Sequence, residues 1–432
     1  MIKQHLRQAW TMMKQHRLFT GMYLAGTAIS IAMAMAVIIT LYIKLGPIYP
    51  EYNRDRTLTI GWLQEKLLDE DYSQFSGVSH HFVESIKNEA KNLDMLCVRW
   101  NGKRQPTSII TNEKNDTEST SLPDWVCSNF WKIFDFRFVD GHPFTEKEEE
   151  QPVAVITTTL AEKLFARHEV AGEYIRIDTT RYKITGVVEP SATSIESAYT
   201  GNEIWASAYY VNPKNSDKDN LHGENTVYML AKTARQLDEL KEEVMAIFRK
   251  EIQQRSKKNS EFHLTIFEHW EHAFYLYKTN GEEAGLFEGI AKYLYAILAF
   301  LFIPALNLCG MISTRMNNRL DEIGVRRSYG ATKGQIISQV LCENLLLTLI
   351  GAILGLLLSY LMVCSGYSWI LTLFEKGGHL KVVSGITFEM LFNPTIIATV
   401  LLVTFVLNVA SALLPTMIAL KKDIVQSLYQ RR

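Results

Sequence analysis

Four long stretches of this sequence carry no acidic or basic side chain, and they lie towards the two ends of the chain. They are the runs between Arg17 and Lys44, between Lys292 and Arg315, Asn344–Phe374 and Met390–Leu420. A helix needs about 20 apolar residues to cross a bilayer, so each run is long enough for one crossing. We therefore predict four transmembrane helices, at residues 18–44, 291–314, 344–365 and 395–420.

The residues between the first two runs, 45–290, have the composition of a soluble domain and alternate between strand-like and helix-like patterns. Short apolar runs predict strands at Val153–Ile156, Tyr174–Ile177 and Tyr182–Val188. Amphipathic spacing predicts helices at His81–Leu93, Thr158–Phe165 and Leu237–Lys250, whereas the polar segment Thr107–Ser121 predicts a loop. The predicted fold is an α-helical membrane bundle of four transmembrane helices, with a large α+β extracytoplasmic domain inserted between helices one and two.

The Lys and Arg residues near the predicted spans indicate which side of the membrane each loop faces. They concentrate before the first span, between the second and third, and after the fourth. Both termini and segment 315–343 are therefore expected in the cytoplasm, and the large domain is expected on the opposite, extracytoplasmic side of the membrane. The remaining predicted segments are an interfacial amphipathic helix at 1–17, a short extracytoplasmic loop at 366–394 and a cytoplasmic tail at 421–432.

Small residues recur every four positions in the third predicted span, at Gly351, Gly355 and Ser359. Such a stripe lets two helix backbones approach closely in lipid. It predicts close helix packing, either within one bundle or between two subunits.

We find no residue pattern that predicts catalysis, a bound cofactor or a resident metal. The segment Gly330–Gly334 lacks the Gly-Lys-Ser/Thr ending of a phosphate-binding loop. His269 and His272 share a helix face, but no third ligand accompanies them, so we predict a surface helix there rather than a metal site. The predicted spans contain no ionisable residue near their centres, which argues against a self-contained ion-coupled transporter.

Cys97 and Cys127 both lie in the predicted outer domain. An oxidising compartment permits a disulfide between them, and the sequence leaves the pairing open.

The most informative short segment is the basic stretch 315–343. Met316, Leu320 and Ile323 form one apolar stripe at helical spacing, and charged residues occupy the other faces. Gly330 suits the left-handed residue that ends a helix, and Thr332 with Gln335 matches a capping box that begins the next one. The segment therefore predicts a helix, a tight break and a second helix, with its charges displayed towards the cytoplasm.

The segment Asp321–Thr332 resembles the cytoplasmic loop of FtsX-like permeases of the MacB type. The outer domain is similar to the periplasmic core domain of that family in the order and spacing of its motifs. Those motifs are Asn129–Phe130, Asp140–Phe144, Val153–Ile156, Leu160–Phe165 and Tyr182–Val188.

The resemblance implies a permease subunit of an ABC-type mechanotransmission complex, in which ATP hydrolysis by a cytoplasmic ATPase moves the extracytoplasmic domain. Only about 17 residues precede the first predicted span, so we expect the ATPase to be a separate chain that binds the ATP. The resemblance assigns ATPase coupling to the helix around residues 316–330, at Arg319, Asp321, Glu322, Ile323, Gly324, Arg326, Arg327 and Gly330.

The other partners that the resemblance implies are a second permease subunit, in a homodimer or a heterodimer, and membrane lipid. A periplasmic adaptor and an outer-membrane channel are further candidates, and no nucleic acid is expected. The expected activity is efflux or extraction of a substrate outside the inner membrane, and the substrate is not indicated. The alternatives are a lipoprotein-release or cell-wall-regulating FtsX-like subunit and, in another class, a membrane-anchored sensor of an extracytoplasmic ligand.

Overall fold

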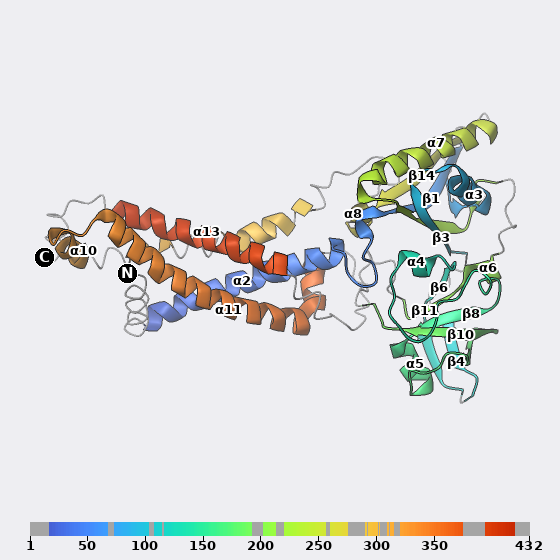
Figure 1. Cartoon of the computed structure of the whole chain (residues 1–432), viewed down its shortest axis with the longest axis horizontal. Helices are drawn as coiled ribbons and strands as arrows, with labels where there is room; N and C mark the ends of the chain where they lie inside the picture. Colours follow the sequence, from blue (N-terminus) through green and yellow to red (C-terminus); the bar gives the residue numbers. More distant parts are fainter. Residues whose placement is uncertain are drawn as a thin grey trace. The chain divides into compact units, whose positions relative to one another are not determined.

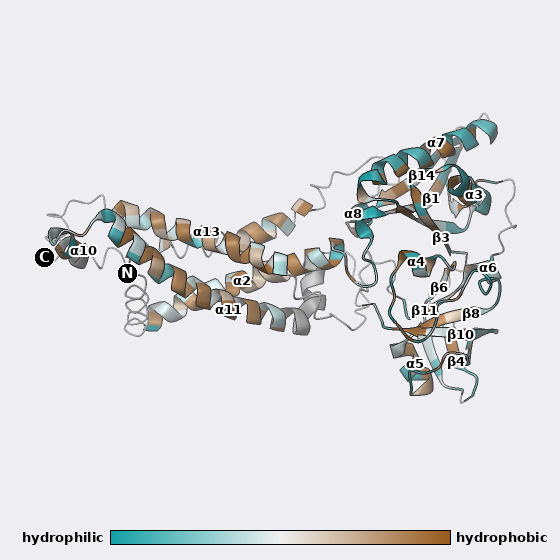
Figure 2. Cartoon of the chain, in the orientation of Figure 1, coloured by the Kyte–Doolittle hydropathy of each residue, from teal (hydrophilic) through white to brown (hydrophobic). Residues whose placement is uncertain are grey.

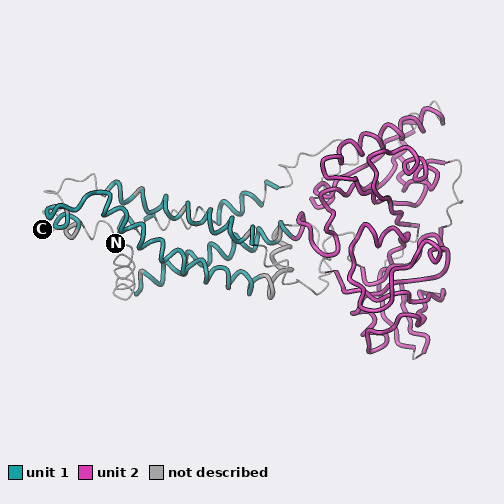
Figure 3. Tube along the Cα trace, in the orientation of Figure 1, with its two compact units in different colours: residues 1–42, 290–378, 387–432 teal, residues 43–289, 379–386 magenta. Residues whose placement is uncertain are grey.

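The computed structural model describes residues 17–67, 73–102, 108–114, 116–191, 202–212, 220–255, 260–274, 290–291, 293–300, 302, 309–310, 312–314, 320–374 and 394–419. The chain divides into two compact units (Figure 3). The first comprises residues 1–42, 290–378 and 387–432, and the second comprises residues 43–289 and 379–386. The second unit is thus formed by residues that lie between parts of the first in the sequence.

The first unit is helical (Figure 1). Its main helices are α2 (Arg17–Leu45), α10 (Leu320–Ser328), α11 (Lys333–Phe374) and α13 (Pro394–Ala419). Among the described residues, three helical stretches are long and apolar enough to cross a membrane: Thr20–Leu45, Lys333–Met362 and Ile397–Ile418. Figure 2 shows that hydrophobic residues predominate along these helices.

Several predicted segments fall wholly or partly outside the described residues. In the predicted span 291–314, residues 293–300 are helical, but most of 301–311 is not described. The total of four spans therefore stays a prediction, as do the interfacial helix at 1–17 and the tail at 421–432.

The α11 helix continues to Phe374, whereas its stretch that is long and apolar enough to cross a membrane ends at Met362, so the end of the third span at residue 365 stays a prediction. No proline or charged residue interrupts the run before Glu375, so nothing in the local sequence ends the helix earlier. The first residues of the predicted loop 366–394 are therefore helical.

The second unit is built on a large sheet that helices cover on both faces. Its helices are α3 (His80–Glu89), α4 (Phe130–Ile133), α5 (Thr158–Phe165), α6 (Ala208–Val211), α7 (Leu237–Arg255) and α8 (His269–Ala273), with 3₁₀ turns η1 (Arg54–Arg56) and η2 (Ala234–Gln236). Its strands are β1 (Thr57–Leu67), β2 (Ser73–Val78), β3 (Leu93–Trp100), β4 (Ser108–Asn112), β5 (Glu118–Ser121), β6 (Pro123–Val126), β7 (Phe138–Gly141), β8 (Val153–Thr157), β9 (Tyr174–Ile177), β10 (Thr180–Val188), β11 (Ile204–Ser207), β12 (His222–Gly223), β13 (Asn225–Ala231) and β14 (Ser260–Glu268). The α+β class predicted for this domain is confirmed.

The described strands form one sheet in the order β12-β2-β1-β13-β3-β6-β11-β8-β10-β9-β4-β5, while β14 pairs with β1 and β7 pairs with β10. Most neighbours are antiparallel, but β8 and β10 are parallel, as are β6 and β11. The α5 helix follows β8 in sequence and its buried leucines pack on this part of the sheet, with Ala154 and Ile156 of β8.

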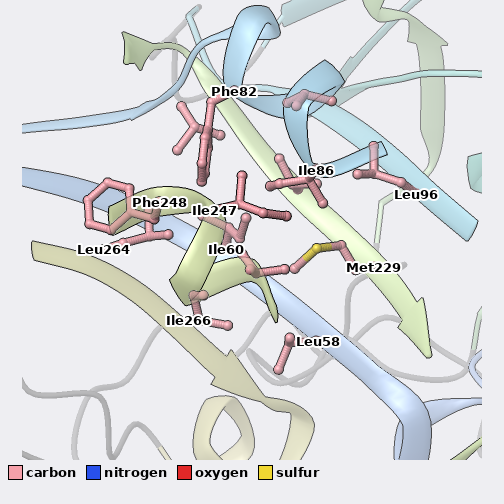
Figure 4. Close-up of a cluster of buried hydrophobic side chains, with 14 of the residues drawn as sticks. Leu58, Ile60, Phe82, Ile86, Leu96, Met229, Ile247, Phe248, Leu264 and Ile266 are labelled. Carbon is pink, nitrogen blue, oxygen red and sulfur yellow. The ribbon is translucent and has the colours of Figure 1, made fainter. Parts of the chain in front are cut away.

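One half of the sheet, around β1, β13 and β3, packs against α3 and α7. Its core includes Leu58 and Ile60 from β1, Phe82 and Ile86 from α3, and Phe248 from α7 (Figure 4). Burial of these side chains follows from the periodicity of each element, because alternate strand residues and every third or fourth helix residue face the same layer.

The other half has an aromatic core beside the short helix α4. Trp205 of β11 is fully buried and contacts the rings of Phe130, Trp131 and Phe136. Ring pairs of this kind add to the burial of apolar area and favour edge-to-face geometry, so Trp205 joins β11 to the α4 layer.

The predicted strands at 153–156, 174–177 and 182–188 and the helices at 158–165 and 237–250 are confirmed within small differences at their ends. The predicted loop at Thr107–Ser121 is wrong, because Ser108–Asn112 and Glu118–Ser121 pair as the β4–β5 hairpin. β4 lies between β9 and the edge strand β5, and its polar residues Ser108, Thr111 and Asn112 are buried, so the polarity of this segment does not indicate exposure to water.

We expect Trp205→Ala to lower the free energy of unfolding of the second unit by about 3–5 kcal/mol, because it leaves a cavity between β11 and α4. Amide hydrogen exchange at Val153–Thr157 measures this loss. The control Phe75→Ala alters an aromatic side chain that is 45% exposed, and it should cost less than about 1 kcal/mol. Equal losses in the two variants would contradict the assignment of Trp205 to the core.

Candidate functional site

The break between α10 and α11 has the geometry that the sequence predicts. Gly330 has a φ of +91°, and the amide of Ala331 donates to the carbonyl of Arg326 at 3.0 Å, which is the bond that closes a left-handed helix end. The Thr332 amide then donates to Gln335 Oε1 at 2.9 Å, and the Gln335 amide donates to Thr332 Oγ1 at 3.3 Å. The predicted stop at Gly330 and the predicted capping box are confirmed.

The residues assigned to ATPase coupling are described to different extents. Arg319 lies outside the described residues, and Asp321, Glu322 and Arg327 are described as part of the α10 backbone only. Ile323 is half-buried and packs against a cluster that includes Tyr23 and Leu347, and Gly324 is buried. The α10 helix is therefore held against the membrane helices of the first unit by its apolar face.

Arg326 is not displayed to solvent as the sequence predicts, because its side chain reaches across to α11. Its Nη1 donates to Gln339 Oε1 at 2.7 Å, and Gln339 Nε2 donates to Glu343 Oε1 at 3.2 Å. Glu343 is buried, at 3% exposure. These hydrogen bonds connect Arg326 on α10 to Gln339 and Glu343 on α11, and they fix the angle between the two helices.

Two apolar residues of this segment face outward, and the sequence analysis did not single them out. Val325 is 46% exposed, and Tyr329 is 89% exposed. They are four residues apart, which is the spacing of neighbours on one helix face. This spacing is the feature of the sequence that could have identified them. Val325 and Tyr329 thus form a small exposed apolar face next to the charged residues of α10.

The membrane helices approach one another closely at the small-residue stripe. A Cβ added at Gly351 would lie 2.9 Å from Thr27 Cβ, and one added at Gly355 would lie 2.8 Å from the Ala28 carbonyl oxygen. Ser359 is fully buried and donates to the Leu356 carbonyl. Side chains larger than hydrogen would push α2 and α11 apart at both glycines.

A polar node joins the three membrane helices next to this stripe. Thr348 Oγ1 on α11 lies 3.2 Å from Tyr23 Oη on α2 and accepts from Asn408 Nδ2 on α13 at 3.1 Å. All three side chains are buried. Such a hydrogen-bonded node stabilises one arrangement of helices in a medium that offers no water.

His269 in the second unit is buried, so the predicted surface helix at Glu268–His272 is wrong for this residue. Its Nε2–H donates to the Lys44 carbonyl at 2.7 Å, and His272 stacks on Phe267 with the ring planes 7° apart. Burial lowers the pKa of His269 well below its ordinary value, and the positive charge of Arg54 lowers it further.

The described residues include no group of three His, Cys, Asp or Glu side chains that could hold a metal ion.

The two cysteines of this unit are buried free thiols. The Val98 amide donates to Cys127 Sγ at 3.3 Å, and burial raises the pKa of Cys97. A protonated, buried thiol is a poor nucleophile, so we assign Cys97 no chemical role.

Ser76, His222 and Glu65 form a hydrogen-bonded line across paired strands. Ser76 Oγ lies 2.6 Å from His222 Nδ1, and His222 Nε2 lies 2.7 Å from Glu65 Oε2. The same hydroxyl donates to the Gly77 carbonyl at 2.9 Å. The three residues lie on β1, β2 and β12, so their hydrogen bonds join neighbouring strands of the sheet.

Comparison with known families identifies two matched regions. Residues 20–247 match the family described as MacB-like periplasmic core domain, and residues 294–424 match the family described as FtsX-like permease C-terminal. The first match alone extends over more than half of the 432 residues.

Curated relatives match over shorter or longer parts of the chain. The pyoverdine export ATP-binding/permease protein PvdT of Pseudomonas savastanoi pv. phaseolicola is 25% identical over 236 residues, which are 54% of this chain and 34% of that protein. The macrolide export ATP-binding/permease protein MacB of Nitrobacter winogradskyi is 21% identical over 365 residues, which are 83% of this chain and 52% of that protein. The matched parts thus span about a third to a half of these relatives' length.

Two solved structures resemble part of the chain. A permease domain from Porphyromonas gingivalis has a TM-score of 0.40 and 16% identity, and the match covers 51% of this chain and 92% of that domain. The periplasmic region of MacB from Actinobacillus actinomycetemcomitans has a TM-score of 0.33 and 12% identity, and the match covers 50% of this chain and 92% of that region.

We expect Gly330→Ala to destabilise the α10–α11 break by about 1–2 kcal/mol, because a Cβ disfavours a positive φ. Gly334→Ala is the matched control, since neither glycine has a neighbouring atom within 4 Å of an added Cβ and only Gly330 has a positive φ. Amide hydrogen exchange across residues 320–336 measures the effect. Equal exchange in the two variants would contradict a role for the left-handed conformation.

Because the pKa of His269 is lowered on folding, the unfolded chain binds more protons below pH 6.5 than the folded chain does. The stability that depends on neutral His269 is therefore present above about pH 6.5 and declines at lower pH, with a slope approaching about 1.4 kcal/mol per pH unit. His269→Gln should flatten this slope, whereas His168→Gln at an exposed site should not. Amide hydrogen exchange in β14 between pH 7 and pH 5 measures this slope. A slope as steep in His269→Gln as in the wild type would exclude His269 as its source.

Proposed function

The chain belongs to the family of ABC transporter permeases that combine a MacB-like periplasmic core domain with an FtsX-like permease C-terminal region, and we propose that it transmits the work of a separate ATPase to its second unit. In this proposal ATP hydrolysis by the partner moves the second unit outside the inner membrane, and that movement drives efflux or extraction of a substrate. The chain itself acts without catalysis, and the ATP is bound by the partner.

The observation that carries this proposal is the fixed link between α10 and α11. The α10 helix presents Val325 and Tyr329 outward, while Ile323 and Arg326 attach it to the helices behind it. The α11 helix runs without interruption over 42 residues, which corresponds to about 63 Å at 1.5 Å per residue. A push on α10 is therefore applied to one end of a continuous rod.

The topology proposed for this mechanism places both termini and α10 in the cytoplasm and the second unit in the periplasm. The Lys and Arg residues around α10 support this orientation. The family membership supports pairing with a second permease subunit, identical or related, whereas the stripe at Gly351 and Gly355 packs against α2 within this chain. An adaptor and an outer-membrane channel are further proposed partners on the periplasmic side.

Export is the activity that we propose over lipoprotein release or cell-wall regulation. The relatives PvdT and MacB are named as exporters of pyoverdine and macrolides. The substrate of this chain follows from neither name, because each relative is matched over only part of its length.

The test uses the tagged full chain, purified from its host in detergent with any ATPase that remains bound. We expect ATPase activity sensitive to vanadate in the wild-type preparation. The variants Tyr329→Ala and Glu322→Lys should reduce the bound ATPase at least tenfold, which corresponds to about 1.4 kcal/mol of binding free energy.

The control for this test is Leu361→Ala, which removes a 66% exposed apolar side chain from a distant part of α11. It should retain the wild-type amount of ATPase. If Tyr329→Ala and Glu322→Lys also retain it, the proposed docking role of α10 fails.

A further inference from the structure

The end of α2 is an unusual helix terminus, because charged side chains of the second unit enclose it. The last carbonyl groups of a helix have no partner within the helix and are normally satisfied by water or by a cap. Here Arg54 Nη1 donates to the Ile43 carbonyl at 2.7 Å, to the Gly46 carbonyl at 3.1 Å and to the Lys44 carbonyl at 3.3 Å. A single guanidinium thus contacts three carbonyl oxygens at the end of α2.

Arg54 is itself held in place by a buried carboxylate. Its Nε donates to Glu51 Oε2 at 2.9 Å, and the two residues are 3% and 1% exposed. The negative end of the helix dipole and the carboxylate both favour the guanidinium charge. Removing one partner of such a buried pair leaves the other charge buried and uncompensated, so Glu51 and Arg54 depend on each other.

A second contact joins the same helix end to α8. His269 Nε2 donates to the Lys44 carbonyl at 2.7 Å, and Lys44 Nζ donates in return to the Ala273 carbonyl at 3.1 Å. Lys44 is 2% exposed. The last turn of α2 and the helix α8 therefore exchange hydrogen bonds in both directions.

Both contacts originate from the same pair of strands. The turn η1, which carries Arg54, leads directly into β1, and α8 directly follows β14. β1 and β14 are antiparallel neighbours, with Leu58 opposite Glu268. The end of α2 is therefore in contact with both η1 and α8, and the β1–β14 strand pair holds these two segments together.

We infer that Arg54 is a positioning residue that, with Glu51, His269 and Lys44, clamps the last turn of α2 to the β1–β14 strand pair. The inference rests on the proposed function, in which displacement of a membrane helix must reach the second unit. With the clamp in place, a movement of the end of α2 is applied to β1, which pairs with β2, β13 and β14. Without it, the last turn unwinds and absorbs the movement.

The chemistry of the clamp requires arginine at this position. The planar guanidinium offers separate donors to Glu51 and to the carbonyls at once, whereas the ammonium of lysine is a single point on a flexible stem. Arg54→Lys keeps the charge and loses this geometry, and Arg54→Gln loses both. Arg56→Gln is the matched control, because Arg56 lies in the same turn and contacts Asp94 and the Ala231 carbonyl instead.

The first experiment measures amide hydrogen exchange of the full chain in detergent, without any ATPase. We expect exchange at residues 42–46 to be at least tenfold faster in Arg54→Gln and Arg54→Lys than in the wild type and in Arg56→Gln. Protection of β8 reports whether the second unit is folded. If Arg54→Gln does not fold, Arg54→Lys carries the test, and wild-type exchange at residues 42–46 in a folded Arg54 variant overturns the clamp.

The second experiment separates positioning from a merely structural role in the purified complex with its ATPase. We expect Arg54→Lys to retain ATP hydrolysis within twofold of the wild type while the ATP-dependent change in exchange of β1 is lost. An ATP-dependent change that persists in this variant overturns the inference and leaves the proposed function intact. If the wild-type chain binds no ATPase, the proposed function fails, and the first experiment still decides the clamp.

Discussion

The hydrogen bonds that the Arg54 guanidinium donates to the carbonyl groups at the end of α2 are the interaction on which the structure of this helix end depends. Within a bilayer every backbone polar group must be satisfied inside the helix, so the first free carbonyls appear where the helix leaves the apolar medium. At that point Arg54 donates to Ile43, Lys44 and Gly46. These residues, at the end of α2, belong to the second unit, whose first residue is Ile43.

The helices of the first unit are also held together by a small number of specific contacts. Its helices are joined by small residues and a few hydrogen bonds, at Gly351, Gly355 and the node around Thr348. Lipid provides no hydrophobic force between helices, so close backbone contact and polar pairing determine which helices adhere. The α10 helix joins this bundle through Ile323 and Arg326, and its Val325–Tyr329 face stays open.

The features that could be predicted from the sequence are those that depend on residues close together in the chain. The helix stop at Gly330 and the cap at Thr332 depend on residues within five positions of each other, and both are confirmed. The burial of His269 depends on Lys44, 225 residues away in the sequence, so no pattern near His269 could reveal it. The strand β4 escaped prediction because its buried residues include Ser108, Thr111 and Asn112, and Ser108 and Asn112 bond Asp178 and the Leu164 carbonyl, which are distant in the sequence.

The central claim is that ATP hydrolysed by another chain moves the second unit of this one. The most direct test is the distance, within one chain of the purified complex, between spin labels at position 139 on β7 and position 361 on α11, which are both exposed sites. Trapping with ATP and vanadate should shift this distance relative to the nucleotide-free complex. An unchanged distance in a complex that still hydrolyses ATP would contradict the account.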